Sequence, residues 1–315
     1  MIAIPDADSL MDGELGIWLA QQADARAQTR VKIVKRIAGA LIIGLPLIAY
    51  GWFSFAFFGQ GIAMLGLLIS GGGLLFAMIA RQKMINSLKE QMNGALAHAL
   101  DISYKIKAEP GEEYDLVCSF GLVGGHNRRT FEDFWEGSLN GTSFRLYEAD
   151  LVMKSGSGKD ETTTTVFHGA ILKFHFAREF HGVTLVERQR KRMTWFGDSQ
   201  KKAGVKLDRV KMVDPRFEDV FDIYGSDAVE ARYLVHPAYC ERLIELEQQF
   251  SGKKLKALFY KGDMIVTVES GSMFESASLD PSKDREMLAR TIDQFRAMAA
   301  LITSLNERAR SAASG

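Results

Sequence analysis

The sequence predicts an α+β protein with an N-terminal two-helix transmembrane hairpin followed by a cytosolic domain of antiparallel β-hairpins packed with helices. Three observations predict this fold class. Two long apolar runs lie near the N-terminus, with only Gly59, Gln60 and Gly61 between them. Beyond them, pairs of short alternating stretches are joined by turn residues, as in β-hairpins. Amphipathic helical patterns follow at residues 237–250 and 281–310.

The two apolar runs, Ile37–Phe58 and Ile62–Ala80, contain no charged residue. An α-helix rises about 1.5 Å per residue, so about 20 residues cross the apolar core of a bilayer. A buried helix pair in a soluble protein is the alternative, but two such runs in succession leave almost no polar face for water. We therefore expect residues 37–80 to form a transmembrane hairpin.

Basic residues flank the hairpin on both sides, whereas the turn between the runs is uncharged. The flanking residues are Arg30, Lys32, Lys35, Arg36, Arg81, Lys83 and Lys89. Because positively charged flanks are retained in the cytoplasm, we expect a multi-pass protein with both termini cytoplasmic.

Small residues recur at a spacing of four within each run. They are Ala40, Gly44, Gly66, Ser70, Gly73 and Ala77. Helices in lipid associate by close backbone approach, so we expect these residues to form the contact between the two spans. In an antiparallel pair folded at Gln60, Gly44 lies within about one turn of Gly73.

The hairpin is expected to be flanked by helical segments. Residues 1–36 are predicted to form a cytosolic N-terminal helix, and residues 81–110 a helical connector that continues the second span. The two extensions either pair as an antiparallel stalk or lie separately on the membrane surface.

Residues 111–310 are predicted to form the cytosolic α+β domain, with residues 311–315 as a tail. A division of this domain into two similar β halves that meet near residue 200 is one alternative. Asn140-Gly141 is the dipeptide that most favours a type I′ turn, so we expect a hairpin around it. A second hairpin is expected around Lys261, Gly262 and Asp263. Residues 209–213 and 230–235 are predicted to be further strands.

The most biased part of this domain runs from Arg188 to Lys211, with nine Lys or Arg residues against Asp198 and Asp208. A solvated loop is one interpretation. A domain held near the inner leaflet also meets anionic head groups, and each Lys or Arg there contributes about 1 kcal/mol. The candidate residues for a lipid surface are Arg188, Arg190, Lys191, Arg192, Trp195, Phe196, Lys201 and Lys202.

No pattern in the chain predicts a catalytic residue, a cofactor site or a metal site. The cysteines, Cys118 and Cys240, lie among apolar neighbours and are expected in the core. None of the histidines or cysteines has the close ligand-pair spacing of a structural zinc site. The formal net charge is zero, which disfavours nucleic acid as a partner, and no nucleic-acid module surrounds the basic segment.

Short motifs in this order resemble an uncharacterised bacterial membrane family known only as a domain of unknown function. They are Phe131-Glu132-Asp133-Phe134 with Gly137 and Gly141, Phe144-x-Leu146-x-Glu148, Val166-Phe167-x-Gly169, Val213-Asp214-Pro215-x-Phe217-Glu218 and Glu230-Ala231-Arg232-Tyr233-Leu234. The resemblance extends from the hairpin to about Glu275. It implies a bacterial inner-membrane protein with a cytosolic α+β domain, and it implies no activity and no catalytic residue.

The function we expect from the sequence is a membrane-tethered cytosolic binding or scaffold domain, with the bilayer and a protein as partners. The alternative is a membrane-associated enzyme or small-molecule sensor at the inner leaflet. A deep pocket with convergent polar groups would favour the enzyme, and an apolar patch or groove would favour a protein partner.

Overall fold

The structure is a computed structural model, and it describes residues 4–53, 57–176, 179–189, 199–212, 214–271 and 277–313. The chain forms two compact units. A sheet unit contains residues 1–5, 96–274 and 289–315, and a helical unit contains residues 6–95 and 275–288. The last part of the helical unit therefore comes from the C-terminal third of the sequence. We call its described part, residues 277–288, the return segment.

The helical unit is built on two long helices joined by a short turn. Helix α3 (Ala23–Phe53) contains Pro46, and α4 (Phe57–Ala99) runs beyond the second apolar run into the sheet unit. Two short helices, α1 (Ala7–Met11) and α2 (Glu14–Gln21), precede α3. The predicted N-terminal helix is thus broken at Asp12, Gly13 and Gln22, in agreement with the poor helix propensity of Gly.

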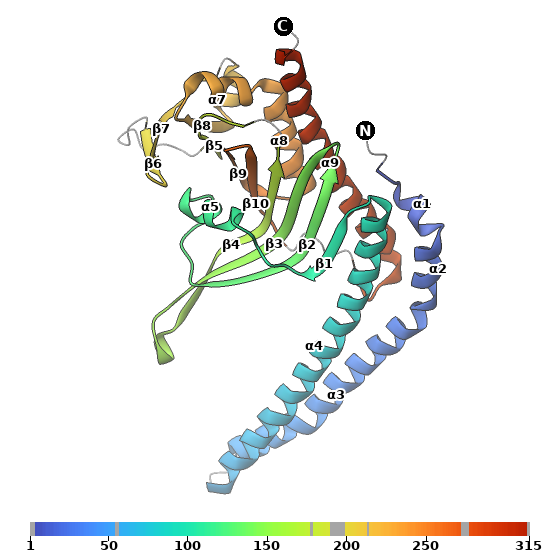
Figure 1. Cartoon of the computed structure of the whole chain (residues 1–315). Helices are drawn as coiled ribbons and strands as arrows, with labels where there is room; N and C mark the ends of the chain where they lie inside the picture. The colour runs from blue at the N-terminus through green and yellow to red at the C-terminus, as the bar shows by residue number, and fades with distance from the viewer. Residues whose placement is uncertain are drawn as a thin grey trace. The chain divides into compact units, whose positions relative to one another are not determined.

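The sheet unit contains one ten-stranded sheet in the order β1-β2-β3-β4-β10-β9-β5-β8-β7-β6 (Figure 1). All its strand pairs are antiparallel. The strands are β1 (Ser103–Lys107), β2 (Arg128–Leu139), β3 (Thr142–Ser155), β4 (Thr162–His175), β5 (Thr184–Arg188), β6 (Ser199–Lys202), β7 (Val205–Arg209), β8 (Phe221–Gly225), β9 (Lys253–Tyr260) and β10 (Asp263–Glu269). The suggested division into two β halves is wrong, because β5 pairs with both β8 and β9 and so joins the strands into one sheet.

Both predicted hairpins are present. Asn140 and Gly141 link β2 to β3 with φ of 50° and 80°, the positive values that a type I′ turn requires. Lys261 and Gly262 link β9 to β10 with φ of 47° and 84°. Local turn chemistry therefore fixes the register of the β2–β3 and β9–β10 pairs.

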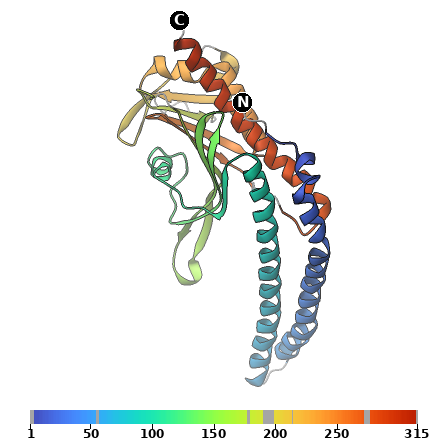
Figure 2. The ribbon, with the colours of Figure 1, turned by 45° about the vertical axis from the view of Figure 1, so that its right-hand side comes forward.

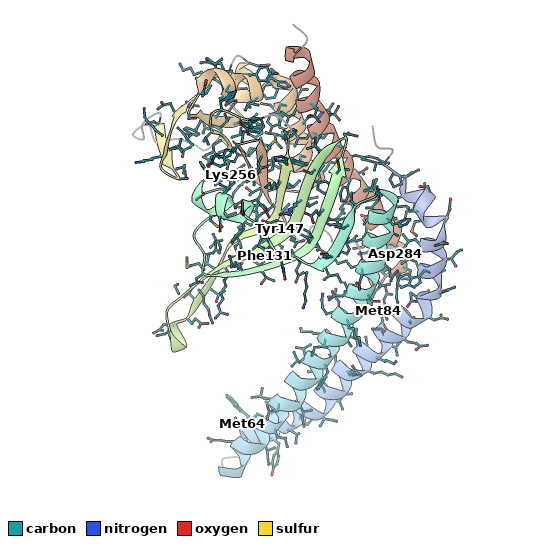
Figure 3. The ribbon with its side chains drawn as sticks, viewed as in Figure 1. Met64, Met84, Phe131, Tyr147, Lys256 and Asp284 are labelled. Carbon is teal, nitrogen blue, oxygen red and sulfur yellow. The ribbon has the colours of Figure 1, made fainter. Side chains whose placement is uncertain are left out.

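Helices cover the two faces of the sheet unequally (Figure 2). On one face lie α8 (Pro237–Gln249) and the part of α9 (Asp284–Ala313) that belongs to the sheet unit, with Phe295 packed against Trp135 and Phe144. On the other lies the short helix α5 (Glu113–Ser119), above a core that includes Tyr147 and Ile171. Figure 3 shows Tyr147 beside Phe131, their ring centroids 5.7 Å apart.

Three further sequence predictions are corrected. Residues 228–234 form α7 (Ala228–Leu234) instead of a strand, because the Asp227 side chain accepts hydrogen bonds from Val229 N and Glu230 N and so caps a helix. The predicted helical connector contains β1, which pairs with β2. The strand predicted at residues 209–213 is not formed over residues 210–212: β7, the second strand of the β6–β7 hairpin, ends at Arg209, and the short helix α6 (Pro215–Glu218) follows.

The remaining short elements are two turns of 3-10 helix. η1 (Gly158–Asp160) lies in the loop between β3 and β4, and η2 (Pro281–Lys283) leads into α9. The predicted tail is shorter than expected, because α9 continues to Ala313.

Candidate functional site

The small residues of the apolar runs lie where α3 and α4 approach each other. A Cβ atom on Gly44 would overlap the Ser70 hydroxyl and lie 2.8 Å from the Gly66 carbonyl oxygen. A Cβ atom on Gly73 would overlap Ala40 Cβ. Gly44 therefore lies opposite Gly66 and Ser70, and Gly73 lies opposite Ala40.

The same helices expose most of their apolar side chains. Of the most apolar window of each helix, only 6% and 11% is buried. Ala77, on the packed side of α4, is among the buried residues. By length and composition, the helices through Phe53 and from Gly59 are therefore candidate membrane spans.

Beyond the apolar runs, an ion pair joins α3 to the return segment. Arg26 is fully buried, and its Nη1 donates to Asp284 Oδ2 at 2.7 Å and to Oδ1 at 2.9 Å. Burial raises the pKa of the Asp284 carboxyl, and the Arg26 guanidinium offsets part of that shift. Arg26 Nε and Nη2 are buried with no hydrogen-bond acceptor among the described residues. The pair is thus strongly desolvated, and each partner depends on the other.

Two exposed pairs extend this contact. Arg30 Nη2 lies 3.5 Å from Asp280 Oδ1, and Arg285 Nη2 lies 2.5 Å from Asp8 Oδ1. We call the three pairs together the clasp. Nothing in the sequence predicted the clasp, because its partners are more than 200 residues apart.

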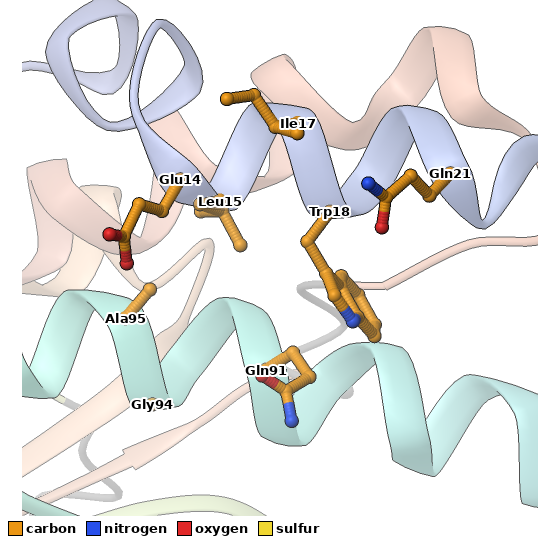
Figure 4. A pocket seen from close by; sticks show the side chains of 8 residues that line it. All are labelled: Glu14, Leu15, Ile17, Trp18, Gln21, Gln91, Gly94 and Ala95. Atoms are coloured by element: carbon orange, nitrogen blue, oxygen red, sulfur yellow. The ribbon is translucent and has the colours of Figure 1, made fainter.

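A groove of about 450 Å³ lies between α2 and α4 (Figure 4). Leu15 and Trp18 point from α2 toward α4, and Gln91 lies below Trp18. No atom lies within 4 Å of a Cβ atom built on Gly94, so the wall on α4 is open there. The lining residues are Glu14, Leu15, Ile17, Trp18, Gln21, Gln91, Gly94 and Ala95. With an exposed Ile17 and one carboxylate, this surface suits an apolar side chain better than a charged one.

Most of the predicted lipid surface lies outside the described residues, namely Arg190, Lys191, Arg192, Trp195 and Phe196. Of the remainder, Arg188 is engaged inside the domain, where it pairs with Glu247 and lies over the Phe221 ring. Lys201 is exposed on the β6–β7 hairpin, and Lys202 is half-buried close to Gly121. Arg188 therefore anchors the start of the basic segment, and Lys201 is the described member that faces solvent.

A polar cluster that sequence reasoning missed lies under α5. Arg145 Nε donates to Glu136 Oε1 at 2.6 Å, and Arg145 Nη1 lies 3.7 Å from the buried Glu113 Oε2. Burial raises the pKa of Tyr147, and the Glu113 carboxylate adds to the shift. Alternation along β3 places Arg145 and Tyr147 on one face, but no local pattern indicates that Glu113 joins them there.

A pocket of about 260 Å³ opens beside this cluster, lined in part by Arg145, Lys173 and His175. The Asp263 carboxylate pairs with Lys173 Nζ at 2.9 Å and with His175 Nδ1 at 2.7 Å. The charges around the pocket are therefore paired with one another, as in a structural network.

The two cysteines differ in environment. Cys240 is buried as expected, and burial raises its pKa to about 12. Cys118 is exposed on α5, so its assignment to the core is wrong. Partial desolvation by its neighbours nevertheless raises the pKa of the Cys118 thiol. Within the described residues, no group of three or more His, Cys, Asp or Glu side chains is placed to hold a metal ion.

Comparison with known proteins gives a family and one structural likeness. Residues 165–307 match the family model described as Protein of unknown function (DUF3137), which confirms the resemblance seen in the motifs. No match was found among curated proteins. A solved structure, that of the mycobacterial trehalose monomycolate transport factor A, TtfA, is similar at 10% identity and a TM-score of 0.35, over 68% of this chain and 95% of that chain. A likeness at this TM-score carries no argument about the function of this chain.

Proposed function

We propose from the geometry of the chain that the protein is a membrane-anchored binding domain, because the family of proteins of unknown function (DUF3137) that residues 165–307 match brings no activity. In this proposal α3 and α4 cross the membrane once each, and the sheet unit lies in the cytoplasm. Bacterial inner membrane is the location that we propose.

One observation carries the proposal: the apolar stretches of α3 and α4 pack against little else in the structure, with 6% and 11% of their windows buried. Leu, Ile and Phe side chains exposed to water over two adjacent helices cost about 25 cal/mol for each Å² of apolar surface. A bilayer removes that cost. Basic residues on both flanks, such as Arg36 and Arg81, favour a hairpin with both ends on the cytoplasmic side.

A membrane location and topology assay tests this proposal directly. The full chain should remain with the membrane after alkaline carbonate washing, and reporter fusions at residues 20 and 315 should both read cytoplasmic. Release by carbonate would argue against the anchor. An external reading at either fusion would argue against the topology while leaving the anchor in place.

We assign binding, not catalysis, to the cytosolic part because the pocket at Arg145, Lys173 and His175 is lined by mutually paired charges, whereas the groove of the helical unit is mostly apolar and open. The groove begins about 11 residues beyond the second apolar run, or about 16 Å along a helix. At this distance from the proposed span, Trp18 in the groove can contact a partner bound at the membrane surface.

The basic segment supports a second contact, with anionic lipid. Full-length protein held in neutral nanodiscs should bind added anionic vesicles more tightly than neutral ones, and salt should weaken this binding. Replacing Arg190, Lys191 and Arg192 by Gln should cost at most about 3 kcal/mol, at about 1 kcal/mol per charge. Lys206→Gln is the matched control, because Lys206 already pairs with Asp208. Equal binding of both vesicle types would leave the segment as a solvated loop.

A further inference from the structure

Two arginines stand at the ends of the helix contact between α3 and α4. Each continues a row of small residues that are spaced by four, and the two rows mirror each other. The rows are Gly44, Ala40 and Arg36 on α3 and Gly73, Ala77 and Arg81 on α4. Residues four apart lie on one side of a helix. Each arginine therefore lies on or beside the side of its helix that carries the contact. We call Arg36 and Arg81 the arginine pair.

The packing of the two helices brings the arginine pair to nearly the same level. A Cβ atom on Gly73 would overlap Ala40 Cβ and would lie 3.5 Å from the Arg36 carbonyl oxygen, so this turn of α3 borders α4. Ala77, one turn further along α4, is 1% exposed, and Arg81 follows one turn later. Side chains lean toward the N-terminus of their own helix. Because α3 and α4 run in opposite directions, the two arginine side chains lean toward a common level.

Neither member of the arginine pair has a carboxylate partner among the described residues. Both are exposed, and the sequence contains no Asp or Glu between Asp24 and Glu90. The return segment supplies carboxylates only further from the apolar run, to Arg26 and Arg30. Two positive charges at one level repel each other, and an anion between them would turn that repulsion into attraction. The charge of the arginine pair therefore calls for an anion from outside the described part of the chain.

We propose that the arginine pair binds the phosphate of one anionic phospholipid, a site that rests on the proposed membrane anchor. Arg36 directly precedes the first apolar run and Arg81 directly follows the second, so a spanning hairpin places both at the level of the head groups. Guanidinium groups bind phosphate through two parallel hydrogen bonds. The acyl chains would lie along exposed apolar side chains of the spans, such as Leu41 and Ile79, a contact that a free phosphate ion cannot make.

Thermal stability of the full chain in a neutral detergent, titrated with lipid, tests this site. Phosphatidylglycerol should raise the melting temperature at a lower concentration than phosphatidylcholine with the same acyl chains, because only phosphatidylglycerol carries a net negative charge. Inorganic phosphate at the same concentrations should have no effect. Arg36→Gln and Arg81→Gln should each raise the half-effective concentration of phosphatidylglycerol about fivefold, the equivalent of about 1 kcal/mol for one charge. The double variant should raise it further, up to about 25-fold.

A matched double variant separates a defined site from a general attraction. Lys35→Gln/Lys83→Gln removes two exposed charges at nearly the same depth, but residues one or two positions from the arginines lie on other sides of their helices. It should change the half-effective concentration less than about twofold.

Three results would overturn the lipid site alone, with the anchor intact. They are equal weakening by the two double variants, an equal response of the parent to the two lipids, and a response to inorganic phosphate as large as that to phosphatidylglycerol. Because both arginines are exposed, Gln should leave the fold intact, and retention of the variants in carbonate-washed membranes checks this. Release of the parental protein by carbonate would instead overturn the anchor and the lipid site together.

Discussion

Along the apolar runs, α3 and α4 meet through Gly44, Gly66 and Gly73, and their other side chains are exposed. Beyond the runs, the same unit is held by a buried Arg26–Asp284 pair and by fully buried Leu88 and Met92. The first half uses close backbone approach, which gains contact without removing apolar surface from water. The second half is held by buried apolar side chains and by a buried ion pair. The energy of both depends on the transfer of these groups out of water.

If α3 and α4 cross a membrane as proposed, the difference shows how one pair of helices can be stable in both lipid and water. In lipid, a leucine gains little by moving from solvent to a helix partner, so small residues at the contact decide the packing. In water, the return segment supplies a carboxylate for a cation that is fully buried. Each half should therefore respond to a different kind of substitution.

The largest expected effect is in the half beyond the spans. Asp284→Asn keeps the size of the side chain but leaves Arg26 buried without a counter-charge, so we expect a loss of about 3–5 kcal/mol in the free energy of unfolding. Urea unfolding in detergent, followed by hydrogen exchange in residues 277–288, measures it.

Two controls accompany this variant. Arg285→Ala removes an exposed pair with Asp8 and should cost less than about 1 kcal/mol. The double variant Arg26→Met/Asp284→Leu should return to within about 1 kcal/mol of the parent, since an apolar pair of similar volume replaces a desolvated one. If Asp284→Asn and Arg285→Ala cost the same, the clasp is only a surface contact.

A smaller effect is expected in the span half. Gly73→Leu places a side chain where even a Cβ atom would overlap Ala40, so we expect a loss of about 1–3 kcal/mol from overpacking. Gly72→Leu is the matched control, because no atom lies within 4 Å of a Cβ atom built on Gly72. Thermal stability of the detergent-solubilised protein separates the two. Similar stabilities would show that these glycines are not the helix contact.

The smallest effect on stability is expected at Gly94, on the same helix but in the groove. Because the space above it is open, Gly94→Leu should raise the free energy of unfolding by up to about 1 kcal/mol through helix propensity. It should also fill the groove and reduce the recovery of any partner that the parental protein captures from native membranes. A loss of stability as large as that of Gly73→Leu would contradict the comparison, since both ends of α4 would then pack alike.

Much of the fold followed from local patterns. Alternation and turn dipeptides predicted the hairpins at Asn140-Gly141 and at Lys261-Gly262, and 3.6-residue periodicity predicted α8 and α9. Helix α7 was missed although Asp227 and Glu230 have the spacing of a helix N-cap and its third residue, because Val and Tyr in the same stretch suggested a strand. β1 was missed because it has only five residues.

The sites were less predictable than the fold. Small-residue spacing identified the residues at which α3 and α4 approach each other, since both helices are continuous in sequence. The clasp and the Glu113–Arg145 contact join residues that are far apart in the sequence and meet only in the folded chain. No local sequence pattern predicts such contacts.

The clasp also has a consequence for biosynthesis. Arg26 and Asp284 are 258 positions apart, so a ribosome that adds about 5–20 residues per second makes the cation roughly 13–50 s before the carboxylate. During that interval the hairpin has been translated and the sheet is still incomplete. Arg26 must then stay hydrated or pair with another anion, and the helical unit reaches its final form only after residue 284 has left the ribosome.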